Sequence, residues 1–263
     1  MDMGLTAKRA LITGSSTGLG RAIAEMLATE GSSVIVHGRD RDRTEKVAAG
    51  IRDAGGDARA VCGDLATADG ARAVAESAGQ VDILVNNAGT YDGLGWADLT
   101  DTRWMQIFET NVISGTRMIG YLVPGMRTRG WGRVVTIGGG LALQPVAVQP
   151  HYSATLAVRH NLTVSLAREL AGTGVTANIV APGAILTEPV REMTLRVAAE
   201  QCWGTDWSDI ERSASAAWFP NDIGRFGRPD EIAAAVTFLC SRHADYISGA
   251  DLRVDGGIVR TVS

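Results

Sequence analysis

The chain has 263 residues, of which 45% are hydrophobic, and this predicts one substantial globular core rather than two small ones. A formal net charge of −4 gives no basic surface, so neither nucleic acid nor an anionic membrane is an expected partner. The N-terminal stretch MDMGLTAKRALITG has only the short apolar run ALI, too short for a signal peptide or membrane span, and we expect a cytoplasmic protein.

The cysteines and histidines form no recognisable disulfide or metal pattern. Three cysteines, an odd number with no CxxC pair, are typical of a reduced protein whose thiols act as small apolar residues. The four histidines lack the spacing of zinc ligands, so no metal site is predicted. Lysine occurs only at Lys8 and Lys46, and nearly all positive charge is therefore arginine.

Short apolar runs alternate with longer helical patterns from the start of the chain. Segments between the runs, such as GRAIAEMLATEG, have apolar residues at three- and four-residue spacing, which is typical of helices. This alternation predicts one α/β domain over residues 1–263, with a doubly wound parallel sheet covered by helices on both faces. The predicted strands are RALIT (9–13), SVIVH (33–37), ARAVC (58–62), DILVN (82–86), RVVTI (133–137), VTANIVA (175–181) and ADLRV (250–254).

The second half of the chain has one long predicted helix and one long excursion. The stretch YSATLAVRHNLTVSLARELAGTG (152–174) predicts a single helix that stops at a glycine. Over residues 187–228 the strand signal vanishes and aromatic residues gather. Two interpretations stay open: a substrate lid, or a helical pair packed over the sheet. A lid would suit an apolar or ring-containing small molecule, whereas core packing would use at least two of Trp203, Trp207, Trp218 and Phe219.

A glycine-rich turn joins the first strand to the first helix. The stretch LITGSSTGLGRAIA places Gly14, Gly18 and Gly20 there, with Ser16 and Leu19 between them. Glycine lets the backbone approach a pyrophosphate, which then lies on the free amides and positive dipole of the helix N-terminus. A plain strand–helix turn rarely needs three glycines in so short a stretch, and we predict dinucleotide binding.

The end of the second strand bears on the choice of cofactor. A carboxylate here would bind an unmodified adenosine ribose, whereas an arginine accommodates a 2′-phosphate. The chain reads VIVHGRD, with Gly38 followed by Arg39. Glycine makes room and the guanidinium can bind a phosphate with two hydrogen bonds, which favours NADP over NAD. The alternative is a solvated surface pair between Arg39 and Asp40.

Several further motifs follow in a consistent order. TGSSTGLG, the pair Asp64–Leu65, NNAG at 86–89, NVISG with Asn111, APGAILT at 181–187, GRFGRPDEIAAAVTFL and YISGADLRVDGG together resemble the motifs of the short-chain dehydrogenase/reductase family along nearly the whole chain. The resemblance implies a seven-stranded Rossmann-type sheet, a nicotinamide cofactor, and a homotetramer or homodimer. The cofactor residues it implies are Gly14, Ser16, Gly18, Leu19, Gly20, Arg39, Asp64, Leu65, Asn87, Ala88, Gly89, Pro182, Gly183 and Thr187.

The resemblance also implies a catalytic set of asparagine, serine, tyrosine and lysine, which this chain matches only in part. Asn111 and Tyr152 are present, but Gly139 and Leu156 occupy the usual serine and lysine positions. A free phenol titrates near a pKa of about 10, and a cation within a few ångströms lowers such a pKa by about one to three units. Losing one preorganised donor to a substrate oxygen costs roughly 3 kcal/mol. Ordinary ketone reduction is therefore expected to be impaired.

No relocated lysine is available, because Lys8 precedes the first strand and Lys46 lies on the helix after the second strand, both remote from Tyr152. Arg159 and His160 follow Tyr152 by seven and eight residues, roughly 10–12 Å along the helix, and we predict helix–helix or subunit contacts for both. His151 is adjacent to Tyr152, but neighbouring helical side chains diverge by about 100°, so capping or solvent exposure is favoured over the site.

The glycine run at 138–140 has two interpretations: a strand end loosened for packing, or a pocket enlarged above the nicotinamide. On these grounds the sequence predicts an NADPH-dependent reductase of an activated carbonyl, with Tyr152, kept protonated, as proton donor. The alternatives are a non-redox isomerase, cyclase or lyase on the same scaffold, and a non-catalytic NADP-binding protein. The sequence does not identify the substrate.

Overall fold

The computed structural model describes residues 2–261, and its centre is a seven-stranded sheet in the order β3-β2-β1-β4-β5-β6-β7, with every neighbouring pair parallel. The predicted fold class is confirmed, and each predicted strand lies within one residue of its observed bounds. The strands are β1 (Arg9–Ile12), β2 (Ser33–Gly38), β3 (Asp57–Cys62), β4 (Ile83–Asn86), β5 (Gly132–Ile137), β6 (Val175–Pro182) and β7 (Asp251–Val254).

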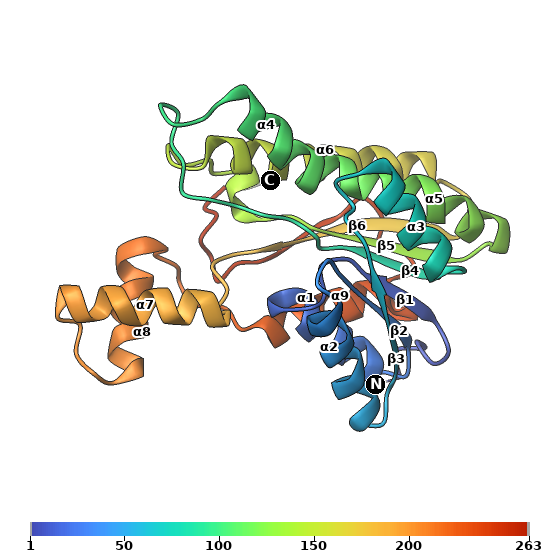
Figure 1. The fold of residues 1–263 in the computed structure, drawn as a ribbon, viewed down its shortest axis with the longest axis horizontal. Coiled ribbons are helices and arrows are strands. Elements are labelled where there is room, and N and C mark those ends of the chain that lie inside the picture. The colour runs from blue at the N-terminus through green and yellow to red at the C-terminus, as the bar shows by residue number, and fades with distance from the viewer. Residues whose placement is uncertain (1, 262–263) are drawn as a thin grey trace.

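Helices cover both faces of this sheet, as Figure 1 shows. One face carries α1 (Gly18–Thr29), α2 (Arg41–Asp53) and α9 (Pro229–Cys240). The other carries α3 (Ala68–Ala78), α5 (Ser114–Arg129) and α6 (Pro150–Glu169), with the short α4 (Asp101–Phe108) at its edge.

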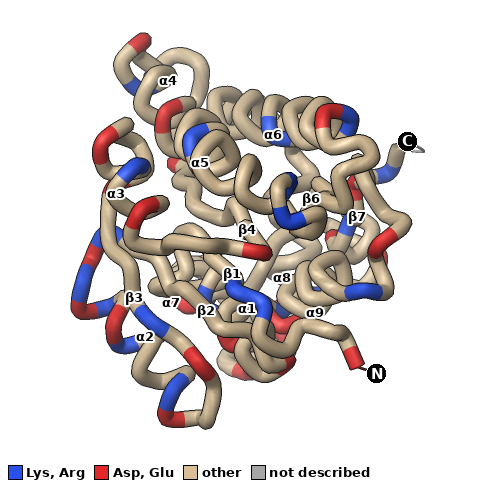
Figure 2. Tube along the Cα trace, turned by 90° about the vertical axis from the view of Figure 1, so that its right-hand side faces the viewer, with Lys and Arg blue, Asp and Glu red and all other residues tan. Residues whose placement is uncertain are grey.

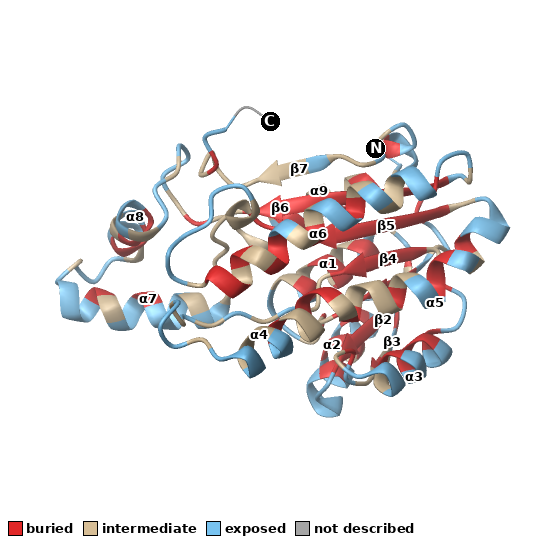
Figure 3. Cartoon of the chain, turned by 90° about the horizontal axis from the view of Figure 1, so that it is seen from above, coloured by how far each residue is buried: buried red, intermediate tan, exposed pale blue. Residues whose placement is uncertain are grey.

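The sheet is buried on both faces, because successive side chains of a strand point to opposite sides. In β1, Ala10 and Ile12 enter the core under α1 and α9, whereas Leu11 enters the core under α3 and α5. In β2, Val36 likewise enters the core under α1 and α9, and Ile35 enters the core under α3 and α5. Figure 3 shows the result, with the central strands buried and the outer helix faces exposed. Because both faces are buried, each central strand is a continuous run of apolar residues in the sequence.

Helix α6 differs from its predicted bounds at both ends. It begins two residues early, at Pro150, because proline is favoured in the first turn, where its missing N–H is not needed. It ends at Glu169 and not at Gly174. The remaining residues form a turn in which Gly172 and Gly174 both have positive φ.

The excursion at 187–228 forms α7 (Glu188–Gln201) and α8 (Trp207–Trp218), which extend beyond the end of the sheet (Figures 1 and 3). The prediction of a helical pair packed over the sheet is therefore wrong. The two helices pack on each other, with the rings of Trp203 and Trp218 5.4 Å apart. A parallel bridge between Ile185 and Gly227 holds the two ends of the excursion together.

The surface and thiols add little beyond this architecture. Figure 2 shows basic and acidic residues interspersed along the exposed helices and loops. None of the helices within residues 2–261 is long and apolar enough to cross a membrane. Over the same range no cluster of histidine, cysteine and carboxylate side chains could hold a metal ion. Cys240 is buried, as a small apolar residue would be, but Cys202 is exposed at the end of α7.

Candidate functional site

The strand order reverses between β1 and β4, and in open parallel sheets a crevice forms at such a point, at the carboxyl ends of the strands. The glycine turn leaves β1 at this edge, and the NNAG segment leaves β4 beside it. Thr13 joins the two, because its hydroxyl accepts hydrogen bonds from the backbone N–H groups of Asn87 and Ala88. The Asn87 side chain in turn donates to the carbonyl of Gly14.

Within residues 2–261, no side chain caps the first amides of α1, which follow the glycine turn. Gly14 and Gly18 have φ of 66° and 53°, which side-chain-bearing residues rarely adopt. A Cβ on Gly20 would overlap the carbonyl oxygen of Gly14. Thr17 precedes α1 but makes no capping hydrogen bond, whereas the corresponding Asp40 of α2 does. Uncapped amides with no acidic residue in the first turn fit a pyrophosphate.

His37, which was not predicted from the sequence, links this glycine turn to the end of β3 through its two ring nitrogens. Its Nδ1 accepts a hydrogen bond from the Gly14 N–H at 3.1 Å, and its Nε2 lies 3.1 Å from the carbonyl oxygen of Gly63. The ring must be neutral with its proton on Nε2 to serve both partners. Burial lowers the pKa of His37 to about 4, although the Gly63 carbonyl acts in the opposite direction.

The end of β2 has no room for a carboxylate side chain at residue 38. A Cβ on Gly38 would overlap Thr44 Oγ1 and come within 2.8 Å of Ser16 Oγ. Arg39 is exposed at the mouth of the crevice. The alternative surface pair with Asp40 is wrong, because Asp40 caps α2 by accepting from the Arg43 N–H and lies 3.6 Å from the Arg43 guanidinium.

The remaining predicted cofactor residues lie around the same crevice. Leu65 is buried while Asp64, with one carboxylate oxygen accepting from the Ala66 N–H, is exposed after β3. Pro182 ends β6, and a Cβ on the following Gly183 would lie 2.8 Å from the Asp255 carbonyl oxygen. Thr187 precedes α7 without using its hydroxyl as a cap. Its methyl carbon lies 3.6 Å from the place that a Cβ on Gly18 would occupy. The hydroxyl is therefore free beside the glycine turn.

Tyr152, near the start of α6, is half-buried, and its ring packs 5.6 Å from that of Tyr91. Burial raises the pKa of Tyr152 above its ordinary value of 10.0, Arg159 lowers it, and Tyr91 raises it further. The net direction is upward. The phenol is therefore protonated at neutral pH.

The Asn111 side chain is fully used in holding other segments. It exchanges two hydrogen bonds with the backbone of Thr90, at 2.8 and 2.9 Å, and donates to the Thr155 hydroxyl on α6. Asn111 belongs to a π-helical turn, Glu109–Ile113, a rare geometry that frees backbone groups from their usual partners. Its own carbonyl oxygen accepts instead from Arg159 Nε, at 2.6 Å.

Arg159 makes the predicted helix–helix contact through Asn111 of the π-helical turn, and it also reaches two carbonyls at and after strand ends that were not predicted. Side chains of a helix tilt towards its N-terminus, so this long side chain returns along α6 towards Tyr152. Its guanidinium donates to the carbonyl oxygens of Asn111, Ile137 and Ala88. It also lies close under Gly89, where a Cβ would be 3.1 Å from Nη2.

The histidines of α6 also depart from expectation. His151 neither caps the helix nor faces solvent: it is fully buried, with Nε2 2.8 Å from an Asp92 carboxylate oxygen and its ring against Trp104. Burial opposes ionisation of Asp92, but hydrogen bonds from Arg103 and the Leu94 amide outweigh it and lower the Asp92 pKa. His160 packs against the glycine run, with Nδ1 3.0 Å from Asp251 on β7.

The glycine run at 138–140 serves packing, and its interpretation as an enlarged pocket is wrong. A Cβ on Gly138 would overlap the His160 ring, and one on Gly139 would lie 3.1 Å from Leu156 Cδ1. A Cβ on Gly140 would lie 2.9 Å from a methyl of Val259. Side chains from α6 and from the C-terminal segment therefore fill the space that these glycines leave.

Comparison with known proteins shows that the chain is similar to short-chain dehydrogenases and reductases. A family model described as short chain dehydrogenase matches residues 8–197. The chain is 36% identical to the uncharacterized oxidoreductase YvaG of Bacillus subtilis (strain 168), over 100% of both chains. It is 37% identical to the 3-oxoacyl-(acyl-carrier-protein) reductase FabG of Vibrio cholerae, over 97% of this chain and 99% of that protein.

Solved structures agree with these sequence matches. L-sorbose reductase from Gluconobacter frateurii, crystallised with NADPH and L-sorbose, is similar with a TM-score of 0.93 and 36% identity, covering 100% of both chains. A 3-oxoacyl-(acyl-carrier-protein) reductase from Agrobacterium tumefaciens with NADP bound has a TM-score of 0.88 and 36% identity, covering 97% of this chain and 96% of that one.

Proposed function

The chain belongs to the short-chain dehydrogenase/reductase family, and from this premise we propose that it is an NADPH-dependent reductase of activated carbonyl compounds with Tyr152 as proton donor. One observation carries the proposal: the protonated, half-buried phenol of Tyr152 and the uncapped glycine turn lie at the same edge of the sheet. The glycine turn lies at the crevice where the strand order reverses, and we propose that the Tyr152 hydroxyl faces the same crevice.

The residues around the crevice fit a dinucleotide whose adenosine carries a 2′-phosphate. The first amides of α1 would hold the pyrophosphate, and Arg39 would hold the 2′-phosphate after Gly38, where no carboxylate side chain fits. The bound NADPH of L-sorbose reductase supports the same cofactor here. The other proposed contacts are Ser16, Leu19, Asp64, Leu65, Asn87, Ala88, Gly89, Pro182, Gly183 and Thr187.

When bound, a reduced nicotinamide would supply a hydride to the carbonyl carbon of the substrate. The contribution of the chain is the proton, which passes from the Tyr152 hydroxyl to the carbonyl oxygen of the substrate. Gly139 and Leu156 supply neither a second donor to that oxygen nor a nearby ammonium, and we propose that the site is atypical in this respect. Activated carbonyls, which need less assistance, are accordingly the expected substrates.

The walls of the crevice suggest an apolar or ring-containing substrate. Tyr91, Trp96 and Val148 are each more than half exposed near Tyr152, on two loops joined by a bridge between Gly95 and Val148. The excursion at 187–228 would close over the same edge as a lid, with the whole chain forming one nucleotide-binding domain. Exposed apolar side chains that gather beside a crevice are typical of a groove that binds an apolar ligand surface.

The test is a titration of the purified protein with NADPH and with NADH, followed by assays of NADPH oxidation over a panel of carbonyl compounds. Tyr152→Phe should lower turnover by about 100-fold or more while leaving NADPH binding intact. Tyr121→Phe, on the exposed surface of α5, is the matched control. Rapid alcohol oxidation at neutral pH would contradict a proton donor of raised pKa. Tight NADPH binding without any turnover would favour a non-redox or non-catalytic protein.

A further inference from the structure

Arg159 is a buried cation whose charge no acidic side chain neutralises. The side chain is 9% exposed, and three of its five N–H donors reach backbone carbonyls at 2.5 to 2.8 Å. Within residues 2–261 none of its hydrogen bonds goes to a carboxylate. Burial lowers its pKa to about 10, so it remains charged at neutral pH.

Bracing three backbone segments does not require this charge. Neutral N–H donors would satisfy the carbonyls of Ala88, Asn111 and Ile137, whereas burying an ionised group costs free energy that partial charges recover only in part. A cation that is buried and hydrogen-bonded only to backbone carbonyls exerts a positive potential on its surroundings. Asn111 offers its carbonyl from a π-helical turn, so the backbone itself is shaped around the guanidinium.

Tyr152 is the neighbouring group that can acquire a negative charge. The two residues are seven apart, which places them on the same face of α6, and the Arg159 side chain leans back towards the phenol. Leu156, 1% exposed, lies between them on that face and keeps water out, which strengthens a charge interaction across it. A cavity of about 30 Å³ next to Arg159, lined also by Asn86, has room for about one or two waters.

We propose that Arg159 is a fixed cation that acts on catalysis through Tyr152. Its positive charge stabilises the phenolate that remains when the Tyr152 phenol gives up its proton. It stands seven residues from the tyrosine and acts without touching substrate. The inference rests on the proposed function for the role of Tyr152 as proton donor.

Other ionisable groups near the phenol do not duplicate this role. Tyr91, packed on the Tyr152 ring, opposes phenolate formation. On the loop and α4 side, Arg103 forms an ion pair with Asp92, against which His151 also lies, so the charges of Arg103 and Asp92 largely offset one another. On the β7 side, His160 pairs with Asp251. Arg159 is the remaining cation acting on the phenol among the residues that the structure describes.

The test measures the ionisation of Tyr152 directly in the protein without cofactor. Fluorinated tyrosine, whose phenol is more acidic, brings the titration below the pH at which Arg159 loses its charge. The chain has four tyrosines, so fluorine NMR gives few signals, and Tyr152→Phe identifies the one of interest. Arg159→Met should raise the Tyr152 pKa by about one unit or more, whereas Arg159→Lys should preserve most of the wild-type value.

Relocating the charge separates electrostatics from packing. The double variant Leu156→Lys/Arg159→Met restores a cation beside the phenol and should return the Tyr152 pKa to the wild-type value or below. An unchanged pKa in folded Arg159→Met, or equal shifts in the Lys and Met variants, would overturn the inference in favour of a brace for the three carbonyls. If Arg159→Met does not fold, Arg159→Gln retains N–H donors without the charge and takes its place.

These outcomes are distinguishable from failure of the proposed function. A pKa that depends on Arg159 in a protein that reduces no carbonyl would refute the reductase proposal and leave the charge interaction standing. Carbonyl reduction with a Tyr152 pKa indifferent to Arg159 would refute only the inference.

Discussion

Leu156 packs against Gly139, so that a Cβ at residue 139 would come within 3.1 Å of its terminal methyl. The two residues that we propose stand in place of the family's serine and lysine therefore form one structural unit: the leucine occupies the space that a side chain at residue 139 would need. Gly139 has a φ of 171°, which any residue adopts, so its backbone does not require glycine. The neighbouring side chain alone restricts the position.

This contact predicts that Gly139→Ser and Leu156→Ala act non-additively on the free energy of unfolding. Gly139→Ser alone should destabilise the fold by about 1–3 kcal/mol through overpacking, and Leu156→Ala in the same protein should relieve part of that cost. Urea unfolding of the single and double variants measures the coupling. Purely additive free energies of unfolding would show that the contact has no energetic consequence.

The same pair predicts a gain of function. Gly139→Ser/Leu156→Lys supplies a hydroxyl donor and an ammonium without the steric conflict, and should increase the reduction of ordinary ketones by at least tenfold. The single Gly139→Ser variant is the control, because it adds the donor while the leucine still crowds it. A folded double variant that binds NADPH but shows no gain would indicate that another part of the site limits ketone reduction.

Prediction from sequence succeeded where a property belongs to a local pattern. Parallel strands buried on both faces must be continuous apolar runs, and this fixed all seven strands nearly to the residue. The carbonyls of Ile137 and Ala88 that Arg159 reaches were not predicted, because a count of axial rise locates Cα atoms and not the end of a long side chain. Gly138 and Gly140 were ambiguous because their neighbours, His160 and Val259, come from distant parts of the chain. His37 carried no motif at all, since its role depends on the meeting of β1, β2 and β3.

Arg39 should determine the preference for NADPH. Arg39→Ala removes charge-assisted hydrogen bonds worth roughly 1.5–3 kcal/mol, so NADPH affinity should fall by about 10- to 100-fold while NADH affinity changes little. Calorimetric titration of both cofactors is the measurement. Arg41→Ala, two residues further on and also exposed, is the matched control. An equal loss for NADPH and NADH would place Arg39 elsewhere than at the 2′-phosphate.

His37 should make the glycine turn sensitive to acid. Its folded-state pKa of about 4 lies below the ordinary 6.5, so the unfolded chain takes up a proton first as pH falls. The stability it contributes is complete above pH 6.5 and is lost as pH falls towards 4, by up to roughly 3 kcal/mol. A proton on Nδ1 would also face the Gly14 N–H, so NADPH binding should weaken over the same range.

His37→Gln should flatten this part of the pH dependence in urea unfolding, because the amide does not titrate between pH 6.5 and 4. His243→Gln, at the exposed start of the segment before β7, should leave the wild-type slope in place. A wild-type slope that survives His37→Gln would assign the acid sensitivity to other groups.

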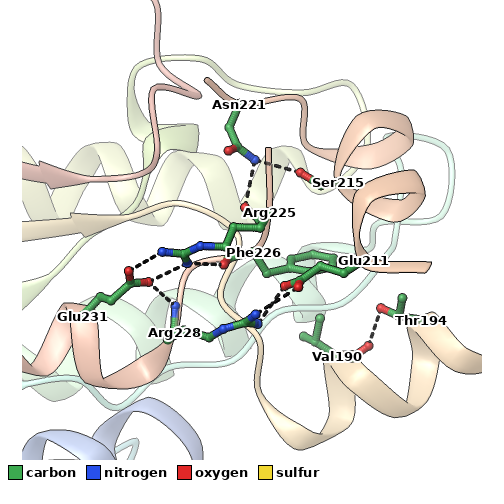
Figure 4. A network of polar contacts seen from close by, with 9 residues as sticks. All are labelled: Val190, Thr194, Glu211, Ser215, Asn221, Arg225, Phe226, Arg228 and Glu231. Atoms are coloured by element: carbon green, nitrogen blue, oxygen red, sulfur yellow. Dashed lines mark hydrogen bonds and ion pairs between the residues drawn. The ribbon is translucent and has the colours of Figure 1, made fainter. Parts of the chain in front are cut away.

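The position of α8 should depend on one ion pair that is drawn in Figure 4. Glu211 of α8, 6% exposed, accepts two hydrogen bonds from the Arg228 guanidinium at 2.7 and 2.9 Å, just before α9 begins. Glu211→Gln cannot reproduce both charge-assisted bonds, and the local cost is about 1–3 kcal/mol. Hydrogen exchange over 207–218 should accelerate by about 5- to 100-fold, while the central strands are unaffected.

The lid proposal adds a kinetic expectation to this variant. If 187–228 closes over bound substrate, a loosened α8 should raise KM for the carbonyl more than it lowers kcat, because ordering of the lid is then needed at binding. Asp209→Asn, which breaks an exposed pair with Arg212 on the same helix, is the matched control and should alter neither exchange nor KM. Faster exchange in Glu211→Gln with an unchanged KM would show that the two helices move independently of substrate binding, and the lid would have to be abandoned.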